Sequence, residues 1–252
     1  ERSNALIKAG CDVLCMDIAH GHSDNFIKAI RDVKKEFDVD LIAGNIATRE
    51  GAEDFVSAGV DCVKVGIGPG STCITRIVTG CGVPQLTAIS WAAEACKGQN
   101  VTVIADGGMR CSGDLVKALA AGADVGIFGG LFSGTDEAPS KMIIENGKKY
   151  KICRGMASSG AMKRRLAVED NGNCTNGNDS NGNGKHTAPE GAEIKVPYQG
   201  SIHNLIANLE AGLRSGMSYC GAHNLAELKQ NARFIRVTPS TQKESGPHND
   251  FW

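Results

Sequence analysis

A short glycine-rich segment carries the residues with the most evident chemistry: Gly66-Ile67-Gly68-Pro69-Gly70-Ser71-Thr72-Cys73. Three glycines and a proline allow backbone N–H groups to turn toward one anion. A cysteine in such a loop is poorly explained by packing, and its thiolate would be a strong nucleophile if the thiol pKa were lowered. The segment therefore predicts a phosphate site beside a nucleophilic Cys73. The alternative is a tight strand-to-helix turn with an inert cysteine.

Two further glycine pairs, Gly107-Gly108 and Gly129-Gly130, follow later apolar runs. In (β/α) barrels, a phosphate often lies between the loops after the last two strands and a helix N-terminus. Three glycine-bearing loops in succession therefore favour a phosphate site. Asp106 ends the first of these runs, where its carboxylate could bind ribose hydroxyls. The alternative role for Asp106 is to cap a helix from Ser112 onward.

The elements that must position these loops form a β-α repeat in which apolar runs alternate with amphipathic stretches. The predicted strands are 13–16, 41–43, 62–65, 101–105 and 125–128, and each ends in Asp, Asn or Gly. Helices are predicted after Ser23 and over 49–58, 89–97 and 113–121. Continuous apolar strands between helices imply a parallel sheet buried on both faces.

The predicted fold class is α/β, a (β/α)8 TIM barrel. A doubly wound sheet would share the periodicity, but candidate residues follow all five strands rather than one switch point. A closed barrel needs eight strands, so we expect an N-terminally incomplete barrel that covers about the last five β/α units. Residues 1–9 are typical of the end of an amphipathic helix.

The second half of the chain has a different pattern. It predicts a hairpin over 143–152 around Asn146-Gly147, helices over 202–215 and 225–231, a strand over 234–237 and a polar tail over 240–252. An Asn/Gly tract at 170–186 cannot build a core and is predicted to be mobile. We assign it to a flap insertion at 163–188 within one catalytic domain, 1–252; a neutral insertion is the alternative.

Composition excludes several classes of protein. A net charge of −1 gives no basis for binding nucleic acid or an anionic membrane, and no apolar run approaches about 18 residues. The ten cysteines have no convincing zinc spacing. Five are predicted to be small buried apolar residues in a reducing cytoplasm: Cys11, Cys15, Cys62, Cys96 and Cys111.

Several segments together closely resemble the IMP dehydrogenase / GMP reductase family. In family order they are Lys64–Arg76, Gly82–Gln85, Ile104–Gly108, Arg154–Met156, Pro189–Gly191, Val196–Gly200 and Glu244–His248. The resemblance extends over nearly the whole chain. It is specific because several independent motifs keep their order.

The resemblance implies a role for each matching residue. Cys73 would form a covalent adduct with the purine, at C2 in the dehydrogenase, and the same thiol would serve C6–amine chemistry in the reductase. The other implied catalytic residues are Thr75, near the reacting carbon, and Arg164 of the flap. The implied substrate-binding residues are Ser71, Gly108, Gly129 and Gly130 for the 5′-phosphate, Asp106 for the ribose, and Met156 and Glu190 for the base edge.

The resemblance also implies a cofactor, a cation and an assembly. NAD, or NADP in a reductase, would contact Asp17, Asn45, Gly66 and Gly68. Potassium would bind carbonyls of Gly68, Gly70 and Cys73 together with Glu244, Ser245 and Gly246 of a neighbouring subunit. The family is tetrameric, so we expect a cytoplasmic homotetramer that binds IMP and XMP, or GMP.

Some positions depart from both family patterns. The dehydrogenase flap carries an Arg-Tyr pair, but no tyrosine lies within 163–188, and Cys153 stands where the dehydrogenase usually has tyrosine. Ser159 stands where the reductase needs a glutamate. These absences also leave open a nucleotide-binding pseudoenzyme.

The remaining matches divide between the two reactions. Reductase-like segments are 17–23, 129–130 and 148–151; dehydrogenase-like segments are 76–80, 135–139, 154–156, 212–217 and the tail from Glu244. The balance favours the dehydrogenase, which converts IMP, NAD and water to XMP and NADH. GMP reductase is the second hypothesis. A further alternative is an unrelated phosphate-binding barrel, but such an enzyme would need a catalytic lysine or carboxylate pair where this chain has the cysteine loop.

Overall fold

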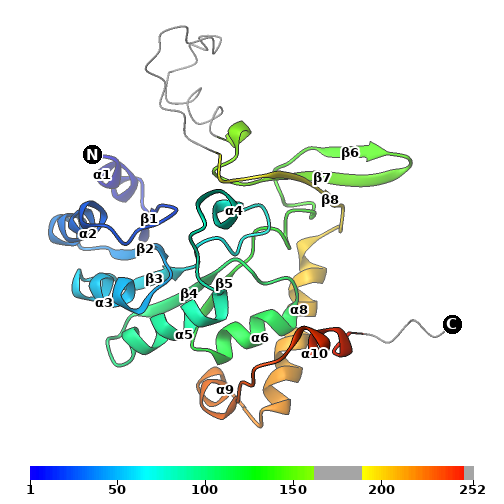
Figure 1. The fold of residues 1–252 in the computed structure, drawn as a ribbon. Helices are drawn as coiled ribbons and strands as arrows, with labels where there is room; N and C mark the ends of the chain where they lie inside the picture. The colour runs from blue at the N-terminus through cyan, green and yellow to red at the C-terminus, as the bar shows by residue number, and fades with distance from the viewer. Residues whose placement is uncertain (162–188, 247–252) are drawn as a thin grey trace, which may run out of the picture.

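The computed structural model of the chain describes residues 1–161 and 189–246. Its centre is a five-stranded sheet in which every neighbouring pair is parallel and the strands follow one another in chain order (Figure 1). The strands are β1 (Val13–Asp17), β2 (Asp40–Ile46), β3 (Cys62–Val65), β4 (Thr102–Asp106) and β5 (Val125–Ile127). The prediction of an α/β fold with a parallel sheet is confirmed.

The strand order bears on the choice between barrel and doubly wound sheet. A doubly wound sheet reverses direction at a switch point, whereas the order β1-β2-β3-β4-β5 contains no reversal. An arc of consecutive parallel strands is the arrangement found within a (β/α) barrel. Closure of the barrel by strands upstream of Glu1 stays a prediction.

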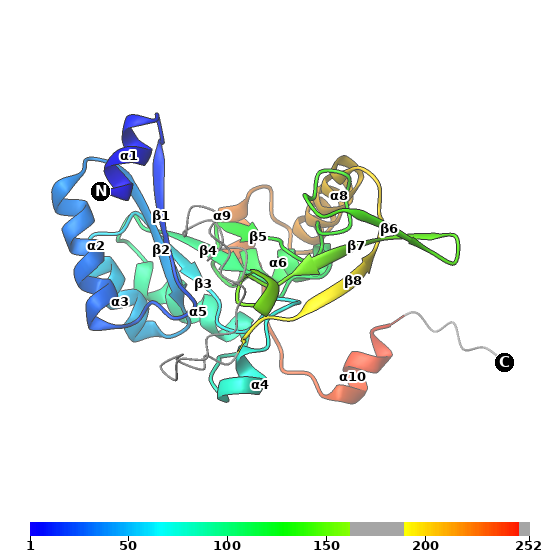
Figure 2. The same ribbon diagram turned by 90° about the horizontal axis from the view of Figure 1, so that it is seen from above.

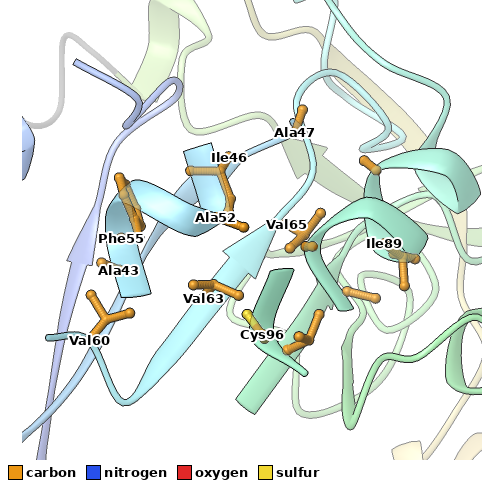
Figure 3. Close-up of a cluster of buried hydrophobic side chains, with 14 of the residues drawn as sticks. Ala43, Ile46, Ala47, Ala52, Phe55, Val60, Val63, Val65, Ile89 and Cys96 are labelled. Atoms are coloured by element: carbon orange, nitrogen blue, oxygen red, sulfur yellow. The ribbon is translucent and has the colours of Figure 1, made fainter. Parts of the chain in front are cut away.

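Helices alternate with these strands. They are α1 (Arg2–Lys8), α2 (Asp24–Glu36), α3 (Arg49–Ser57), α4 (Thr75–Thr79), α5 (Gln85–Cys96) and α6 (Ser112–Ala120). Figure 2 shows α2, α3 and α5 along one face of the sheet. The core lies between that face and the helices, where Phe55 of α3 and Ile89 of α5 pack against Val63 and Val65 of β3 (Figure 3). All four residues of β3 are buried, as the continuous apolar run predicted.

Two equivalent turns fix the order of the strands at their amino ends. Asp61, just before β3, accepts hydrogen bonds from the backbone N–H of Leu41 in β2 (2.7 Å) and from Lys34 (2.7 Å). Asp124, just before β5, accepts the N–H of Val103 in β4 at 2.8 Å. Each aspartate follows the same type of helix-to-strand turn, so each carboxylate joins a strand to the one before it.

A second sheet projects from this body. It contains β6 (Met142–Glu145), β7 (Lys148–Arg154) and β8 (Glu193–Pro197), all antiparallel. The predicted hairpin is confirmed, because Asn146 and Gly147 both have positive φ and occupy its two-residue turn. In both ribbon views the β6–β7 hairpin extends away from the five-stranded sheet (Figures 1 and 2). The sequence did not predict β8.

Three helices end the described chain: α8 (Ile202–Tyr219), α9 (Leu225–Asn231) and α10 (Pro239–Glu244). The predicted strand at 234–237 is wrong. These residues have no regular secondary structure, and Phe234, Ile235 and Val237 are exposed. Their composition suits a strand, but no strand of the described chain pairs with them. The tail over 240–252 was predicted only as polar, yet its first residues belong to α10.

The prediction for the cysteines is only partly right. Cys62 and Cys96 are buried, whereas Cys15 and Cys111 are exposed and Cys11 is half-buried. Cys15 lies in edge strand β1, which has a neighbour on one side only. Cys111 precedes α6, outside the apolar face of that helix.

Arg164, the flap at 163–188 and its Asn/Gly tract lie outside the described residues, as do residues 247–252. Across the described ranges, no helix has the length and apolar character needed to cross a membrane.

Candidate active site

The three glycine-bearing loops converge at the carboxyl ends of β3, β4 and β5. A side chain on Gly66 would collide with the carbonyl oxygen of Asp106. A Cβ on Gly107 would lie 3.2 Å from the Cα of Gly70, and one on Gly130 would collide with the hydroxyl of Ser71. The glycines are therefore required because the loops after β3 and β4 approach backbone to backbone, and the loop after β5 approaches the Ser71 side chain.

These loops enclose one side of a pocket of about 990 Å³. Six of the seven predicted substrate-binding residues line it: Ser71, Asp106, Gly108, Gly129, Gly130 and Met156. The lining also includes the apolar side chains of Phe128, Phe132, Ile152 and Ile194. A pocket of this size, with a few polar groups on an apolar wall, suits a nucleotide-sized ligand.

Cys73 follows the pocket-lining residue Thr72 and begins a chain of side-chain contacts. Its Sγ lies 3.2 Å from Oγ1 of Thr75, and that hydroxyl donates to Oε2 of Glu190 at 2.7 Å. Sulfur, hydroxyl and carboxylate thus form a continuous path for a proton. Glu190 was predicted only to read the base edge, so its place beside Thr75 was missed.

Backbone hydrogen bonds hold the segment that carries Glu190 against the catalytic loop. The N–H of Ile74 donates to the carbonyl of Glu190 (2.8 Å), and the N–H of Ala192 donates to the carbonyl of Thr72 (2.7 Å). On the other side of this segment, a Cβ on Gly191 would lie 2.6 Å from the backbone nitrogen of Ser158. The Pro189–Gly191 motif therefore places a carboxylate at the thiol although 115 residues separate Thr75 from Glu190.

The predicted ribose and cofactor residues meet at a buried lysine. Lys64 of β3 donates to Asp17 (2.9 Å), to Asp106 (2.8 Å) and to Asn45. Asn45 in turn donates to the carbonyl of Gly66 (2.7 Å) and to Asp106 (3.0 Å). Asp106 therefore belongs to this network. The alternative role, capping the helix at Ser112, is wrong, because Cys111 is the residue before α6 and Asp106 bonds elsewhere.

Charge explains the protonation state of the lysine. Burial alone would lower the pKa of Lys64, but hydrogen bonds to Asp106 and Asp17 outweigh that effect and raise its pKa above the ordinary value. The ammonium is therefore charged at neutral pH. The available signal in the sequence was a single lysine inside the buried run Cys62–Val65, where a charge needs partners.

Two further side chains hold the catalytic loop in shape. Nε of Arg76 donates to the carbonyl of Ile67 (3.2 Å), and its Nη2 donates to that of Val83 (2.6 Å). Nε2 of Gln85 donates to Val65 in β3 (2.9 Å) and to the backbone of Asp106 in β4 (3.2 Å). Both residues belong to the motifs that carried the resemblance, but no role was predicted for either.

Two of the predicted potassium ligands in the loop belong to one turn, in which the N–H of Cys73 donates to the carbonyl of Gly70 at 3.0 Å, and Gly68 precedes that turn. Carbonyl oxygens are the ligand type that potassium takes in proteins, so the donor set suits the ion. Glu244, Ser245 and Gly246 lie at the end of α10, which both ribbon views draw apart from α4 and the loop before it (Figures 1 and 2). The described residues contain no cluster of three His, Cys, Asp or Glu side chains that could hold a metal.

Comparison with known proteins identifies the family. The family described as "IMP dehydrogenase / GMP reductase domain" matches residues 1–248. An inosine-5′-monophosphate dehydrogenase of Nitrosopumilus maritimus is 49% identical over 99% of this chain and 52% of its own length. A GMP reductase of Leishmania donovani is 46% identical over 99% of this chain and 50% of its own.

A crystal structure of the GMP reductase variant C318A from Trypanosoma brucei, in complex with guanosine 5′-monophosphate, superposes with a TM-score of 0.88. It is 43% identical and covers 98% of this chain and 49% of that one. The chain thus spans about half the length of these relatives. Because the match extends over almost every residue and includes the glycine loop with Cys73, the chain belongs to the IMP dehydrogenase / GMP reductase family.

Proposed function

We propose that this chain is the catalytic part of an NAD-dependent IMP dehydrogenase, which converts IMP, NAD and water to XMP and NADH. The observation that supports an active enzyme of this family is the contact chain from the Cys73 thiol through Thr75 to the Glu190 carboxylate. This chain supplies a nucleophile and a proton acceptor in one place. It therefore supports an active enzyme over a pseudoenzyme.

The chemistry has two stages. In the first, the thiolate of Cys73 would bond to C2 of the purine as a hydride leaves C2, and bound NAD would supply the hydride acceptor. In the second, water attacks C2, the C2–sulfur bond breaks, and the thiolate is released with XMP. Thr75 and Glu190 would take the proton of that water, because the Thr75 hydroxyl already donates to the carboxylate.

The pocket accounts for the binding of a nucleotide. Ser71 and the glycine pairs would hold the 5′-phosphate through N–H and hydroxyl groups, while Asp106 would accept the ribose hydroxyls. Met156, with 90% of its surface exposed at the pocket, would offer its backbone to the base edge. The GMP bound to the Trypanosoma brucei enzyme supports a purine monophosphate as the ligand class.

The residues proposed for the cofactor fit a dinucleotide. Asp17 keeps 60% of its side chain exposed at the end of β1, so one carboxylate oxygen is free for a ligand hydroxyl. Asn45 shares the Lys64 ammonium with Asp17, and its amide donates to the backbone of Gly66. The site can therefore hold the nicotinamide riboside next to the purine pocket.

GMP reductase is the second candidate, favoured by a specific observation. Ser159 lacks the carboxylate expected for ammonia chemistry, but Glu190 brings a carboxylate to the same thiol through Thr75. The proton path therefore serves either reaction. The preference for the dehydrogenase rests on its greater share of matching segments, including 76–80, 135–139 and 212–217.

The architecture around this site is part of the proposal. We infer that the five strands are the last units of an eight-stranded barrel and that the protein acts as a homotetramer. Edge strand β5 has Val125 and Ile127 exposed, which is consistent with a further strand beside it in the complete protein.

The test is an assay of the complete protein with IMP plus NAD and with GMP plus NADPH, side by side. Formation of XMP with IMP, lost in Cys73→Ala and kept in the exposed-cysteine control Cys81→Ala, supports the dehydrogenase. Release of ammonia from GMP without IMP oxidation would select the reductase. Binding of IMP with neither reaction would select the pseudoenzyme.

A further inference from the structure

Lys64 occupies a position that neither ligand site explains alone. Its side chain is only 8% exposed, and its ammonium contacts residues of three other strands: Asp17 in β1, Asn45 in β2 and Asp106 in β4. An ammonium group has three N–H donors, and each has an acceptor here. Four consecutive strands are therefore joined at one nitrogen atom.

The surrounding backbone is shaped to admit this side chain. Lys64 pairs with Gly44 across β2 and β3, and a Cβ on Gly44 would lie 2.6 Å from the Cβ of Lys64. Asn45 fixes the other end of the network, since its amide donates to the carbonyl of Gly66 and to Asp106. The orientation of Lys64 is thus coupled to the start of the catalytic loop.

We propose that Lys64 is a positioning residue that holds Asp106, Asp17 and Asn45 in one hydrogen-bonded unit, so that the nucleotide site and the cofactor site both depend on it. The inference rests on the proposed function, because it uses the ligand roles proposed for those three residues. Lys64 itself needs no contact with either ligand.

The charge of Lys64 explains why both ligand sites should depend on it. One ammonium neutralises two carboxylates, and it satisfies the carbonyl oxygen of the buried Asn45 side chain. Removing the charge would leave both carboxylates close together without a cation and a buried amide oxygen without a donor. Asp106 and Asp17 would then turn toward solvent, away from the positions that face the two ligands.

The test measures binding without turnover. In the complete protein carrying Cys73→Ala, calorimetry gives the Kd of IMP and, at saturating IMP, the Kd of NAD. Lys64→Met should raise both Kd values about tenfold or more, the size expected for losing a charged hydrogen bond. Lys64→Arg should raise both by less, because it keeps the charge but its planar guanidinium cannot meet three acceptors from one atom.

Lys34→Met is a matched control. Lys34 also bonds an aspartate, Asp61 at 2.7 Å, but at the amino end of β3, away from the pocket. Its loss should lower the Tm and leave both Kd values unchanged. If Lys64→Met does not fold, Lys64→Arg decides the question, since both Kd values must still rise together.

Two results would overturn the inference: folded Lys64 variants whose Kd values match the parent, or a rise confined to one ligand. Turnover of the wild-type protein is measured separately. A wild type that binds IMP and NAD but converts neither IMP nor GMP refutes the proposed reaction, while the two Kd values still decide the role of Lys64. A wild type that binds no purine nucleotide overturns both.

Discussion

Among single residues, Glu190 is the one on which hydrolysis of the adduct depends, because it is proposed to accept a proton from water. Glu190→Gln keeps a hydrogen-bond acceptor for Thr75 but removes the basic carboxylate. We expect turnover of IMP to fall by roughly 10²- to 10⁴-fold, the range for loss of a general base. Because hydride transfer precedes hydrolysis, rapid mixing should show a burst of NADH before the slow steady state.

Glu145→Gln is the control for this prediction, because Glu145 in the projecting β6–β7 hairpin pairs with Lys195 of β8, away from Cys73. It should leave turnover unchanged. A Glu190→Gln enzyme with normal turnover and no burst would show that the contact chain does not carry the proton.

Burial makes a second residue-scale prediction, for the cysteines. Burial raises the pKa of Cys62 to about 12 and that of Cys96 to about 11, and the charge of Asp124 adds to both effects. Alkylation needs the thiolate, so iodoacetamide at pH 8 should spare these two thiols in the folded protein and modify them after unfolding. Peptide mass spectrometry checks this, and bound IMP should in addition protect Cys73.

The raised pKa values of Cys62 and Cys96 also make the free energy of unfolding depend on pH. A thiol whose pKa is higher in the folded state favours folding below its unfolded pKa, near 9.0, and that contribution is lost as the pH rises toward 11 to 12. Stability should therefore decline across that alkaline range, and less steeply in Cys62→Ala. An equal slope in both proteins would contradict the assigned cause.

Among the helices, α8 packs so closely on α6 that position 216 has no room for a larger side chain. A Cβ on Gly216 of α8 would lie 2.7 Å from Cγ1 of Val116 in α6. Gly216→Ala should therefore lower the free energy of unfolding by about 1–3 kcal/mol, as overpacking does. Urea unfolding measures this, and the added substitution Val116→Ala should recover part of the loss.

Gly113→Ala provides the opposite case in the same pair of helices. Gly113 lies within α6, and a Cβ there would meet nothing closer than the sulfur of Cys111 at 3.8 Å. Alanine should therefore stabilise the helix by about 0.5–1 kcal/mol. Equal effects of the two substitutions would show that the interhelical contact is not limiting.

The elements also show what a sequence can predict. The five strands were found because apolar runs end at residues such as Asp17, Asp106 and the glycine pairs, which mark the carboxyl edge of the sheet. The segment 234–237 has equally strand-like composition, but pairing needs a free edge in space, which composition does not encode. Strand β8 was missed because its residues, Glu193–Pro197, alternate charged and apolar side chains and lack the apolar run by which the strands of the parallel sheet were found.

The candidate site was predictable to the same degree. Glycine positions predicted that three loops meet, and the structure places these loops in contact. The contacts of Glu190 and Lys64 could not be predicted, because one depends on a segment distant in sequence and the other on the register that sets Lys64 beside Gly44. Family motifs named Glu190 but could not give its partner.

At the scale of the whole molecule, the proposed potassium site requires a second subunit. One chain offers carbonyls of Gly68, Gly70 and Cys73, and the proposed partner contributes residues 244–246. Replacing potassium by lithium should lower turnover several-fold in the complete protein. A variant lacking residues 244–246 should have low turnover in either salt, as a steady-state assay can show. Turnover that is indifferent to the cation in both proteins would refute this site.

We propose that catalysis passes through a covalent bond between Cys73 and a purine nucleotide. The most direct measurement is mass spectrometry of the complete protein, quenched in acid during turnover of IMP and NAD. The peptide that contains Cys73 should carry the added mass of one purine monophosphate, and the same peptide of Cys73→Ala should carry none. Turnover by Cys73→Ala, or an adduct on any other residue, would contradict it.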